Sequence, residues 1–302
     1  MILLLIGLAL ADQIAPECAV FDKQPPPCDG TNDELCYDEQ TQADFMANYT
    51  ALASTFSPLH APVPHEGGRG SIGVDFNIIP PLSCYHRYVL DWTKTEDTNK
   101  TPVLPRPTVS FAFQPIRGRI YPYASLGFVP PVPIPDGDYT VRTTLFAGEF
   151  GFGFFVNEKL STGLRVHSTI MRTVGNVATA YEGEEHEFND LYVASSSGLD
   201  LMAGWNMGVV TPYVALGWTE TQTYFWIGDD GYVANNLHPY QGPSLALGGD
   251  ALVKDSLRLA GEFYAAPGGY KDQTNDPETD TFGPKSRYGR IYTARFRVAK
   301  EF

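Results

Sequence analysis

A chain of 302 residues with 19% charged and 13% aromatic side chains, 29 glycines and 24 prolines has the composition of an all-β protein rather than a helical one. Its net charge of -14 is uneven, because residues 12–66 hold ten acidic residues and a single lysine. No basic patch indicates nucleic-acid binding, and no stretch approaches the ~20 continuous apolar residues of a transmembrane helix.

The first eleven residues have the pattern of a secretory signal peptide. Residues 1–11 are apolar and end in Ala9-Leu10-Ala11, a small-residue site that predicts cleavage before Asp12. The alternative is a buried strand. Export would place the protein in a compartment that permits disulfides.

Four cysteines follow, at positions 18, 28, 36 and 84. Their spacing matches neither a zinc site nor a C-x-x-C redox pair. We expect one disulfide among the first three cysteines, and the remaining one has Cys84 as a candidate partner. The spacing leaves the connectivity open.

Residues 12–66 are predicted to form an acidic, proline-containing periplasmic segment with one helix over about 42–56. Apolar residues recur there at helical spacing, including Phe45, Tyr49, Leu52 and Phe56. Thr41 is the predicted N-cap. A lone short helix needs a surface to pack on, so it either plugs or covers one mouth of the following domain or is loosely tethered in the periplasm.

From residue 67 onward the hydrophobic period changes from 3.6 to 2, which predicts strands. Short and long connections alternate, as in transmembrane β-barrels. We predict an antiparallel transmembrane barrel of ten strands, or of twelve if Tyr85–Trp92 also crosses. The ten strands are predicted at about 70–79, 108–114, 120–129, 142–156, 160–173, 192–206, 209–226, 242–253, 256–265 and the last fifteen residues.

The final strand has an apolar face and a charged face and ends on an aromatic residue, Phe302. This ending, with the alternation that precedes it, resembles bacterial outer-membrane β-barrels over residues 68–302. The resemblance implies a Gram-negative outer membrane, contact with lipid and lipopolysaccharide, and both chain ends in the periplasm. It also implies insertion by the outer-membrane assembly machinery, which would recognise Phe302, Val298 and Phe296. Lys300 departs from the apolar residue usual at its position.

The second face of the strands carries charges and glycines. In an outer-membrane barrel the apolar face points to lipid, so the charged face lines the lumen, and glycine there makes room for large neighbours. A narrow barrel would pair these charges in a structural network; the alternative is a polar path for a small solute. The predicted lumen charge network is Asp75, Glu149, Arg165, His167, Asp200, Asp250, Arg258, Glu262, Arg295 and Arg297.

Candidate chemistry is sparse, and no cofactor or metal site is predicted. His167 and Ser168 are adjacent in a strand and therefore face opposite sides. Omptin-like proteases have a similar barrel size and carry paired Asp and Asp-His groups at the rim; here Asp229, Asp230, His186 and His238 lie on long loops. The acidic loop from Asp272 to Asp280 is a solvated loop by default, with weak calcium binding as the alternative.

The sequence therefore predicts a non-enzymatic outer-membrane barrel, structural or surface-binding, with a filled or narrow lumen. A porin-like small-solute channel is the first alternative. An omptin-like or lipid-acting hydrolase at the rim is the second.

Overall fold

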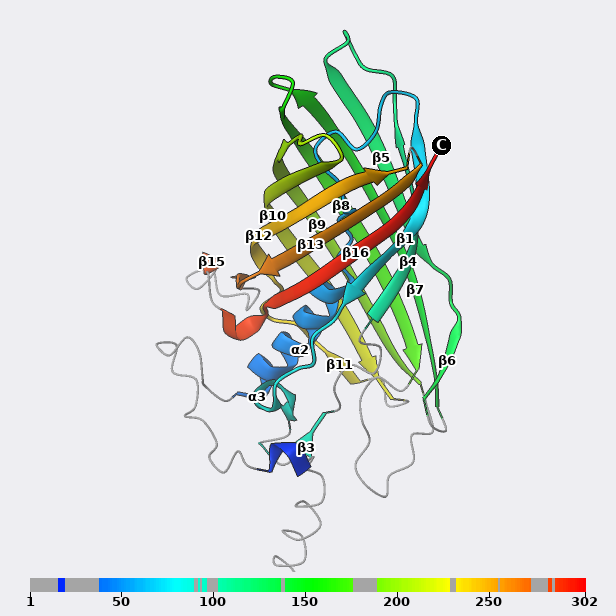
Figure 1. The fold of residues 1–302 in the computed structure, drawn as a ribbon. Coiled ribbons are helices and arrows are strands. Elements are labelled where there is room, and N and C mark those ends of the chain that lie inside the picture. The colour runs from blue at the N-terminus through cyan, green and yellow to red at the C-terminus, as the bar shows by residue number, and fades with distance from the viewer. Residues whose placement is uncertain are drawn as a thin grey trace, which may run out of the picture.

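A computed structural model describes residues 16–19, 38–89, 92, 94–96, 103–136, 139–175, 189–228, 232–254, 256–272, 282–283 and 286–302. Its main feature is a closed antiparallel barrel (Figure 1). The ten barrel strands are β1 (Gly70–Ile78), β4 (Val103–Ala112), β5 (Ile120–Val129), β7 (Tyr139–Phe155), β8 (Leu160–Gly175), β9 (Asp190–Trp205), β10 (Val210–Ile227), β12 (Gln241–Val253), β13 (Leu257–Ala266) and β16 (Ile291–Glu301).

Each barrel strand pairs with its neighbours in sequence, and the last strand closes on the first. In that seam Asp75 of β1 lies opposite Arg297 of β16. Two short strands extend the wall at one end: β6 (Pro133–Asp136) pairs with β7, and β11 (Tyr232–Ala234) pairs with β10. The ten-strand prediction is confirmed.

The twelve-strand alternative is wrong. Residues 84–87 form a helical turn, α3 (Cys84–Arg87), and β2 (Tyr88–Val89) folds back on β3 (Lys94–Thr95). This segment therefore belongs to the long connection between β1 and β4. A second long connection, between β13 and β16, holds β14 (Tyr270–Lys271), β15 (Phe282–Gly283) and a 3₁₀ turn, η2 (Ser286–Tyr288).

Strand β4 starts five residues earlier than predicted. The prediction began after Pro105 and Pro107, yet both prolines lie within the strand. A proline cannot donate to a strand ladder and normally argues against a strand. Both prolines are exposed while Arg106 between them is buried, so the alternation of faces continues through them.

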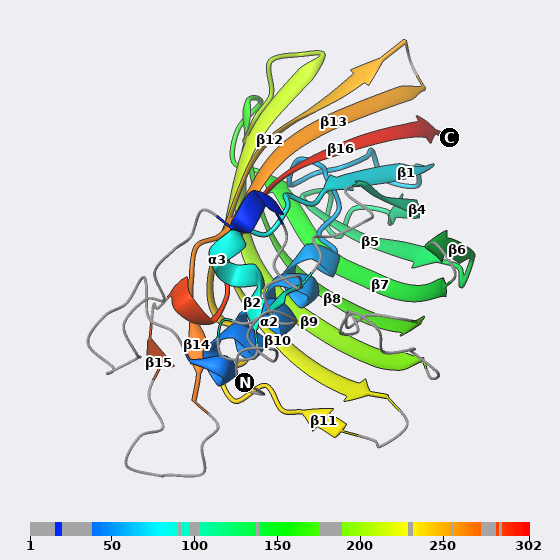
Figure 2. The same cartoon turned by 90° about the horizontal axis from the view of Figure 1, so that it is seen from below.

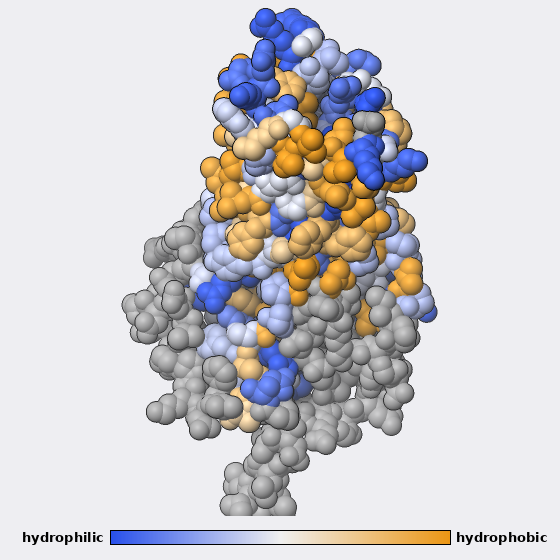
Figure 3. Space-filling model, viewed as in Figure 1, coloured by the Kyte–Doolittle hydropathy of each residue, from blue (hydrophilic) through white to orange (hydrophobic). Residues whose placement is uncertain are grey.

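The two faces of the wall are chemically opposite. Large apolar side chains such as Leu126, Phe146 and Leu201 are about 60% exposed on the outside. Figure 3 shows apolar residues gathered in a band around the strands, with hydrophilic residues at the short-turn end. Such an apolar outer band suits the hydrocarbon core of a bilayer. Among the described residues no helix is long and apolar enough to cross a membrane.

The N-terminal helix is α2 (Glu39–Ser54), which begins three residues before the predicted start. Its N-cap is Asp38 rather than Thr41, because the Asp38 carboxylate accepts a hydrogen bond from the Thr41 backbone N–H at 3.1 Å. A short 3₁₀ turn, η1 (Pro16–Cys18), precedes it. The predicted signal peptide lies outside the described residues.

Helix α2 lies at the long-loop end of the barrel, inside the curve formed by the strands (Figure 2). The C-terminus lies at the opposite, short-turn end (Figure 1), where Phe302 exchanges backbone hydrogen bonds with Gly70. Helix α2 and the C-terminus therefore lie at opposite ends of the barrel. The chain can reach β1 from α2 only by passing down the lumen.

Candidate functional site: the occupied lumen

The inner wall of the barrel is lined with charged side chains. Arg106 of β4 and Glu301 of β16 lie on this wall, together with the residues of the predicted network. Every network residue is buried, with at most 8% of its surface exposed: Asp75, Glu149, Arg165, His167, Asp200, Asp250, Arg258, Glu262, Arg295 and Arg297.

Arg165 is the centre of one ion-pair group. Its Nε donates to Asp200 Oδ2 at 2.6 Å, and its NH1 lies 3.7 Å from Glu149 Oε2. The Nε2 of His167 lies 3.4 Å from the same Asp200 oxygen. Strand register produces this group, because Arg165 pairs directly with Asp200 across β8 and β9.

Two further groups complete the wall. Arg258 lies 2.7 Å from Asp250 and 3.3 Å from Glu301. On β16, Arg295 lies 3.6 Å from Glu262, and Arg297 lies 3.5 Å from Asp75. Because removal of one member would leave an uncompensated buried charge, these groups fix the inner wall in one arrangement.

The lumen is occupied by residues 55–65, which we call the plug segment. Phe56, Leu59 and His60 of this segment are fully buried. At the long-loop end, just before the segment, the carbonyl of Ala53 in α2 accepts from Asn77 Nδ2 of β1. At the short-turn end His65 Nε2 lies 2.8 Å from Ser110 Oγ of β4. The segment therefore spans the lumen lengthwise.

The wall hydrogen-bonds to the backbone of this stretch. Arg106 NH1 donates to the carbonyls of Ser54 and Thr55 at 3.2 and 3.1 Å, and Arg165 NH1 donates to that of Pro58 at 3.0 Å. Two further bonds run the other way: the Phe56 N–H donates to Thr169 Oγ1, and the Ala61 N–H donates to Asp250 Oδ2. A buried segment outside any sheet needs such partners for its backbone groups.

His60 links the plug segment to the Arg165 group. Its Nδ1 lies 2.7 Å from the carbonyl of Ala61, which can only accept, so Nδ1 carries a proton. Its Nε2 lies 2.8 Å from Glu149 Oε1. One proton therefore lies between the imidazole and the carboxyl group, and the contact is a strong, buried hydrogen bond.

Glycines of the wall make the space for this segment. An added Cβ at Gly153 would lie 2.1 Å from the Pro62 carbonyl oxygen, and one at Gly204 would lie 2.8 Å from Pro62 Cδ. On β5, a Cβ at Gly127 would lie 2.8 Å from the Phe56 ring. The inner wall thus follows the outline of the plug segment, with no room for side chains at these positions.

Helix α2 docks at the mouth through Asn48. The Asn48 amide donates to the carbonyls of His238 and Tyr288 at 2.8 and 2.6 Å. Its oxygen accepts from the Tyr240 backbone N–H and from Thr221 Oγ1. One buried side chain thereby joins the helix to the β10–β12 connection and to the β13–β16 connection.

A second contact of α2 with the rim is the pair Asp44–His238. Asp44 Oδ2 lies 2.6 Å from His238 Nδ1, and the His238 ring stacks on Tyr288 at 3.9 Å. Burial raises the pKa of Asp44 above its usual value, although its hydrogen bonds to His238 and Gln40 oppose the shift. His238 thus holds the helix in the mouth.

The N-terminal arm is joined covalently to the first long connection by a disulfide between Cys18 and Cys84. Around it, Arg87 NH1 lies 3.0 Å from Glu17 Oε1, and the Tyr88 hydroxyl donates to the Cys18 carbonyl at 2.7 Å. This pairing is one that the sequence left open. Cys28 and Cys36 lie outside the described residues.

Sequence reasoning missed Arg106, His60 and His65. Arg106 was assigned to a loop because prolines flank it, although continuing the alternation of β4 backward would have placed it on the lumen face. The two histidines lie between the predicted helix, which ends at about residue 56, and the first predicted strand. Nothing in their spacing indicates burial, because a threaded segment has no period of its own.

Most of the other candidate residues lie where the structure gives no description. Asp229, Asp230 and His186 lie outside the described residues, as does the proposed calcium loop beyond Asp272. In the described parts of the chain no three His, Cys, Asp or Glu residues are grouped to hold a metal. Ser168 is exposed on the outer face and His167 is buried, as the alternation predicts.

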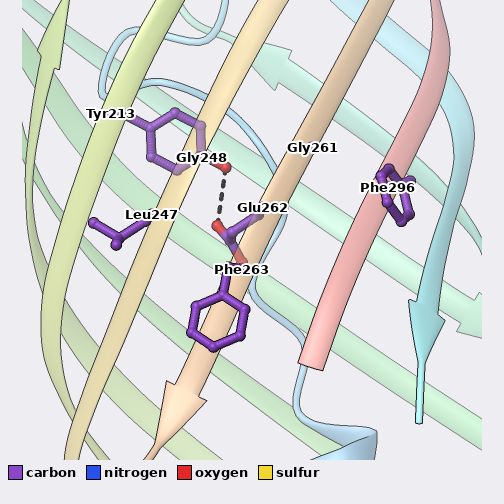
Figure 4. Close-up of a pocket in the computed structure, with 7 residues that line it drawn as sticks. All are labelled: Tyr213, Leu247, Gly248, Gly261, Glu262, Phe263 and Phe296. Carbon is purple, nitrogen blue, oxygen red and sulfur yellow. Dashed lines mark hydrogen bonds between the residues drawn. The ribbon is translucent and has the colours of Figure 1, made fainter. Parts of the chain in front are cut away.

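A thin place in the wall lies between β12 and β13 (Figure 4). Gly248 and Gly261 leave a depression there, flanked by the apolar side chains of Leu247, Phe263 and Phe296. On the lumen side the Tyr213 hydroxyl donates to Glu262 Oε2 at 2.9 Å. The hydrogen-bonded Tyr213 and Glu262 side chains therefore cover the lumen side of the wall at the two glycines.

A closed ten-stranded antiparallel barrel, apolar outside and charged inside, with short and long connections at opposite ends, is the fold of bacterial outer-membrane β-barrels. No family model and no curated protein matches the chain.

Several solved structures share the general architecture. The translocator domain of the autotransporter NalP from Neisseria meningitidis is 12% identical, with a TM-score of 0.46, over 80% of this chain and 90% of that one. The toluene transporter TbuX from Ralstonia pickettii is 9% identical, with a TM-score of 0.35, over 82% and 96%. The outer-membrane protease OmpT from Escherichia coli is 12% identical, with a TM-score of 0.33, over 78% and 92%.

Proposed function

We propose that the protein is a non-enzymatic outer-membrane barrel that keeps its lumen closed with its own N-terminal segment and presents the long-loop mouth as a binding surface. The observation that carries this proposal is the burial of residues 55–65 against the charged inner wall. Because the segment fills the glycine-lined space and its backbone is bonded to Arg106 and Arg165, it blocks a solute path along the lumen.

The proposal includes an orientation. Long loops of bacterial barrels face outward and short turns face the periplasm. On this ground the mouth that holds α2 and the Cys18–Cys84 disulfide faces outward, and Phe302 lies on the periplasmic side, where the assembly machinery would bind it together with Val298 and Phe296. Lipopolysaccharide is the partner expected around the outer rim.

A small-solute channel is the second candidate, and one observation favours it. The lumen is blocked by a separable segment rather than by wall side chains alone, so displacement of that segment would leave a polar passage. The contacts that hold it include hydrogen bonds from Arg106 and Arg165, which exchange readily with water once a segment moves.

Current recordings in planar lipid bilayers test both candidates. We expect the intact protein to give no steady current and a variant lacking residues 12–66 to conduct, with circular dichroism verifying that the barrel has formed. Steady current through the intact protein would contradict the closed barrel and favour the channel. A folded deletion variant without current would show that wall side chains close the lumen, and would exclude the channel.

A further inference from the structure

The Cys18–Cys84 disulfide closes a ring of chain that passes through the barrel. From Cys18 at the long-loop end the chain continues into α2 and crosses the lumen to the short-turn end as the plug segment. It then returns within the wall as β1, which leads to Cys84. The chain reverses direction at Gly70, which pairs with Phe111 and Phe302 at the short-turn end. One half of the ring, β1, is therefore part of the barrel wall, and the other half contains the plug segment.

We propose that this disulfide is a covalent latch that keeps the plug segment in the lumen. The proposal rests on the proposed function, in which that segment closes the barrel. While the bond is intact, both Cys18 and Cys84 stay at the long-loop end and Gly70 stays in the wall at the other end. Chain must then cross the lumen between them in every conformation that leaves the barrel closed.

Without the bond, the only restraint on withdrawal toward the short-turn end is noncovalent. Residues 16–19 are held by the ion pair between Glu17 and Arg87. Helix α2 is held by the hydrogen bonds of Asn48 and by the Asp44–His238 contact. The plug segment adds its bonds to the wall, such as the one between His60 and Glu149. These contacts can open one after another, whereas a closed ring cannot.

The surroundings of the bond fit this role. Cys18 is fully buried, and Arg87 and Tyr88, which follow Cys84 in the chain, are almost fully buried against it. The Tyr88 hydroxyl donates to the Cys18 carbonyl, and Arg87 NH1 lies 3.6 Å from Cys18 Sγ. The arm is thus attached at a packed site on the first long connection rather than at a loop tip.

The test compares Cys18→Ser/Cys84→Ser with Cys28→Ser/Cys36→Ser, a control that leaves the latch in place. In planar bilayers we expect the control to stay closed and the latch variant to show openings with the conductance of the 12–66 deletion. The open fraction should rise on the order of a thousandfold, the size of effect that releasing a closed loop of 66 residues has on an equilibrium.

Hydrogen exchange of the Phe56 and Ala61 amides, which donate to Thr169 and Asp250, gives a second measurement. Both amides should exchange faster in the latch variant than in the control. Unchanged exchange and no openings, with a conducting deletion variant, would overturn the latch and keep the plug. If the deletion variant does not conduct, the proposed closure fails, and exchange alone decides whether the disulfide retains the segment.

Discussion

At the scale of single residues, the plug segment fits the lumen because its large side chains lie against glycines of the wall. Phe56 and Pro62 of the plug segment lie over glycines of the wall, and Arg106 and Arg165 donate to its carbonyls. The glycines were predicted from the sequence as space for large neighbours. The segment that occupies this space was not predicted. The alternation of lipid-facing and lumen-facing residues describes the wall and contains no information about a segment that passes inside it.

A valine on β7 tests this fit. In Gly153→Val the new side chain would collide with the backbone of Pro62, whereas in the matched control Gly148→Val the Cβ points outward and has no neighbour closer than 3.7 Å. Overpacking of this kind typically costs about 1–3 kcal/mol, and a surface change about 0.5 kcal/mol or less. Denaturant unfolding in detergent micelles measures both variants, and equal losses would show that Gly153 does not face the plug segment.

At the scale of elements, the strands were predictable and the position of the helix was not. Alternation located nine strands closely, and only β4 was misplaced, by its prolines. The helix was located as an element by its apolar stripe, but its docking depends on buried polar side chains such as Asn48 and Asp44. Their partners lie about 190 residues away in the chain, and spacing within the helix cannot identify them.

His86 of α3 provides a pH test of this docking. Its ring stacks on Phe45 at 3.7 Å, and burial, aided by the positive charge of Arg290, lowers its pKa to about 3. In a released loop the pKa would be about 6.5. The folded pKa is depressed, so the neutral ring stabilises docking above pH 6.5. That contribution is lost by about 1.4 kcal/mol per pH unit as the pH falls toward 3.

Exchange protection of α2 should therefore fall between pH 7 and pH 4.5 in the wild type, after correction for intrinsic rates. In His86→Phe, which keeps the stacking and removes the titration, protection should fall much less. Asp44 is present in both proteins, and its raised pKa favours the docked form on acidification, so the comparison isolates His86. Parallel loss of protection in both proteins would assign the pH effect to another group.

At the scale of the whole molecule, the barrel was predictable because each strand repeats the same requirement. A membrane wall must be apolar outside, its connections must alternate in length, and the final strand must pair with the first. The path of residues 39–66 is set by none of these requirements. It depends on whether α2 lies at the long-loop end or at the short-turn end before the chain enters β1. An even strand number is compatible with both positions.

A cross-link between the plug segment and the wall tests the central claim, that the chain threads its own barrel. A Cβ at position 163 would lie 3.2 Å from Pro62 Cβ, close to the spacing of ~3.5–4.5 Å in a disulfide. It would also lie 2.7 Å from the Phe152 carbonyl oxygen, so β8 must shift slightly to accept it. The variant Pro62→Cys/Gly163→Cys, in a Cys28→Ser/Cys36→Ser background, should therefore form a 62–163 disulfide on mild oxidation. The matched pair Pro62→Cys/Leu164→Cys places the second thiol on the exposed outer face.

Peptide mapping of the non-reduced protein measures both products. We predict the 62–163 bond in most molecules and no 62–164 bond, because position 163 faces the lumen and position 164 faces lipid. Absence of the 62–163 bond in a folded barrel, or equal yields from both pairs, would contradict the threaded lumen.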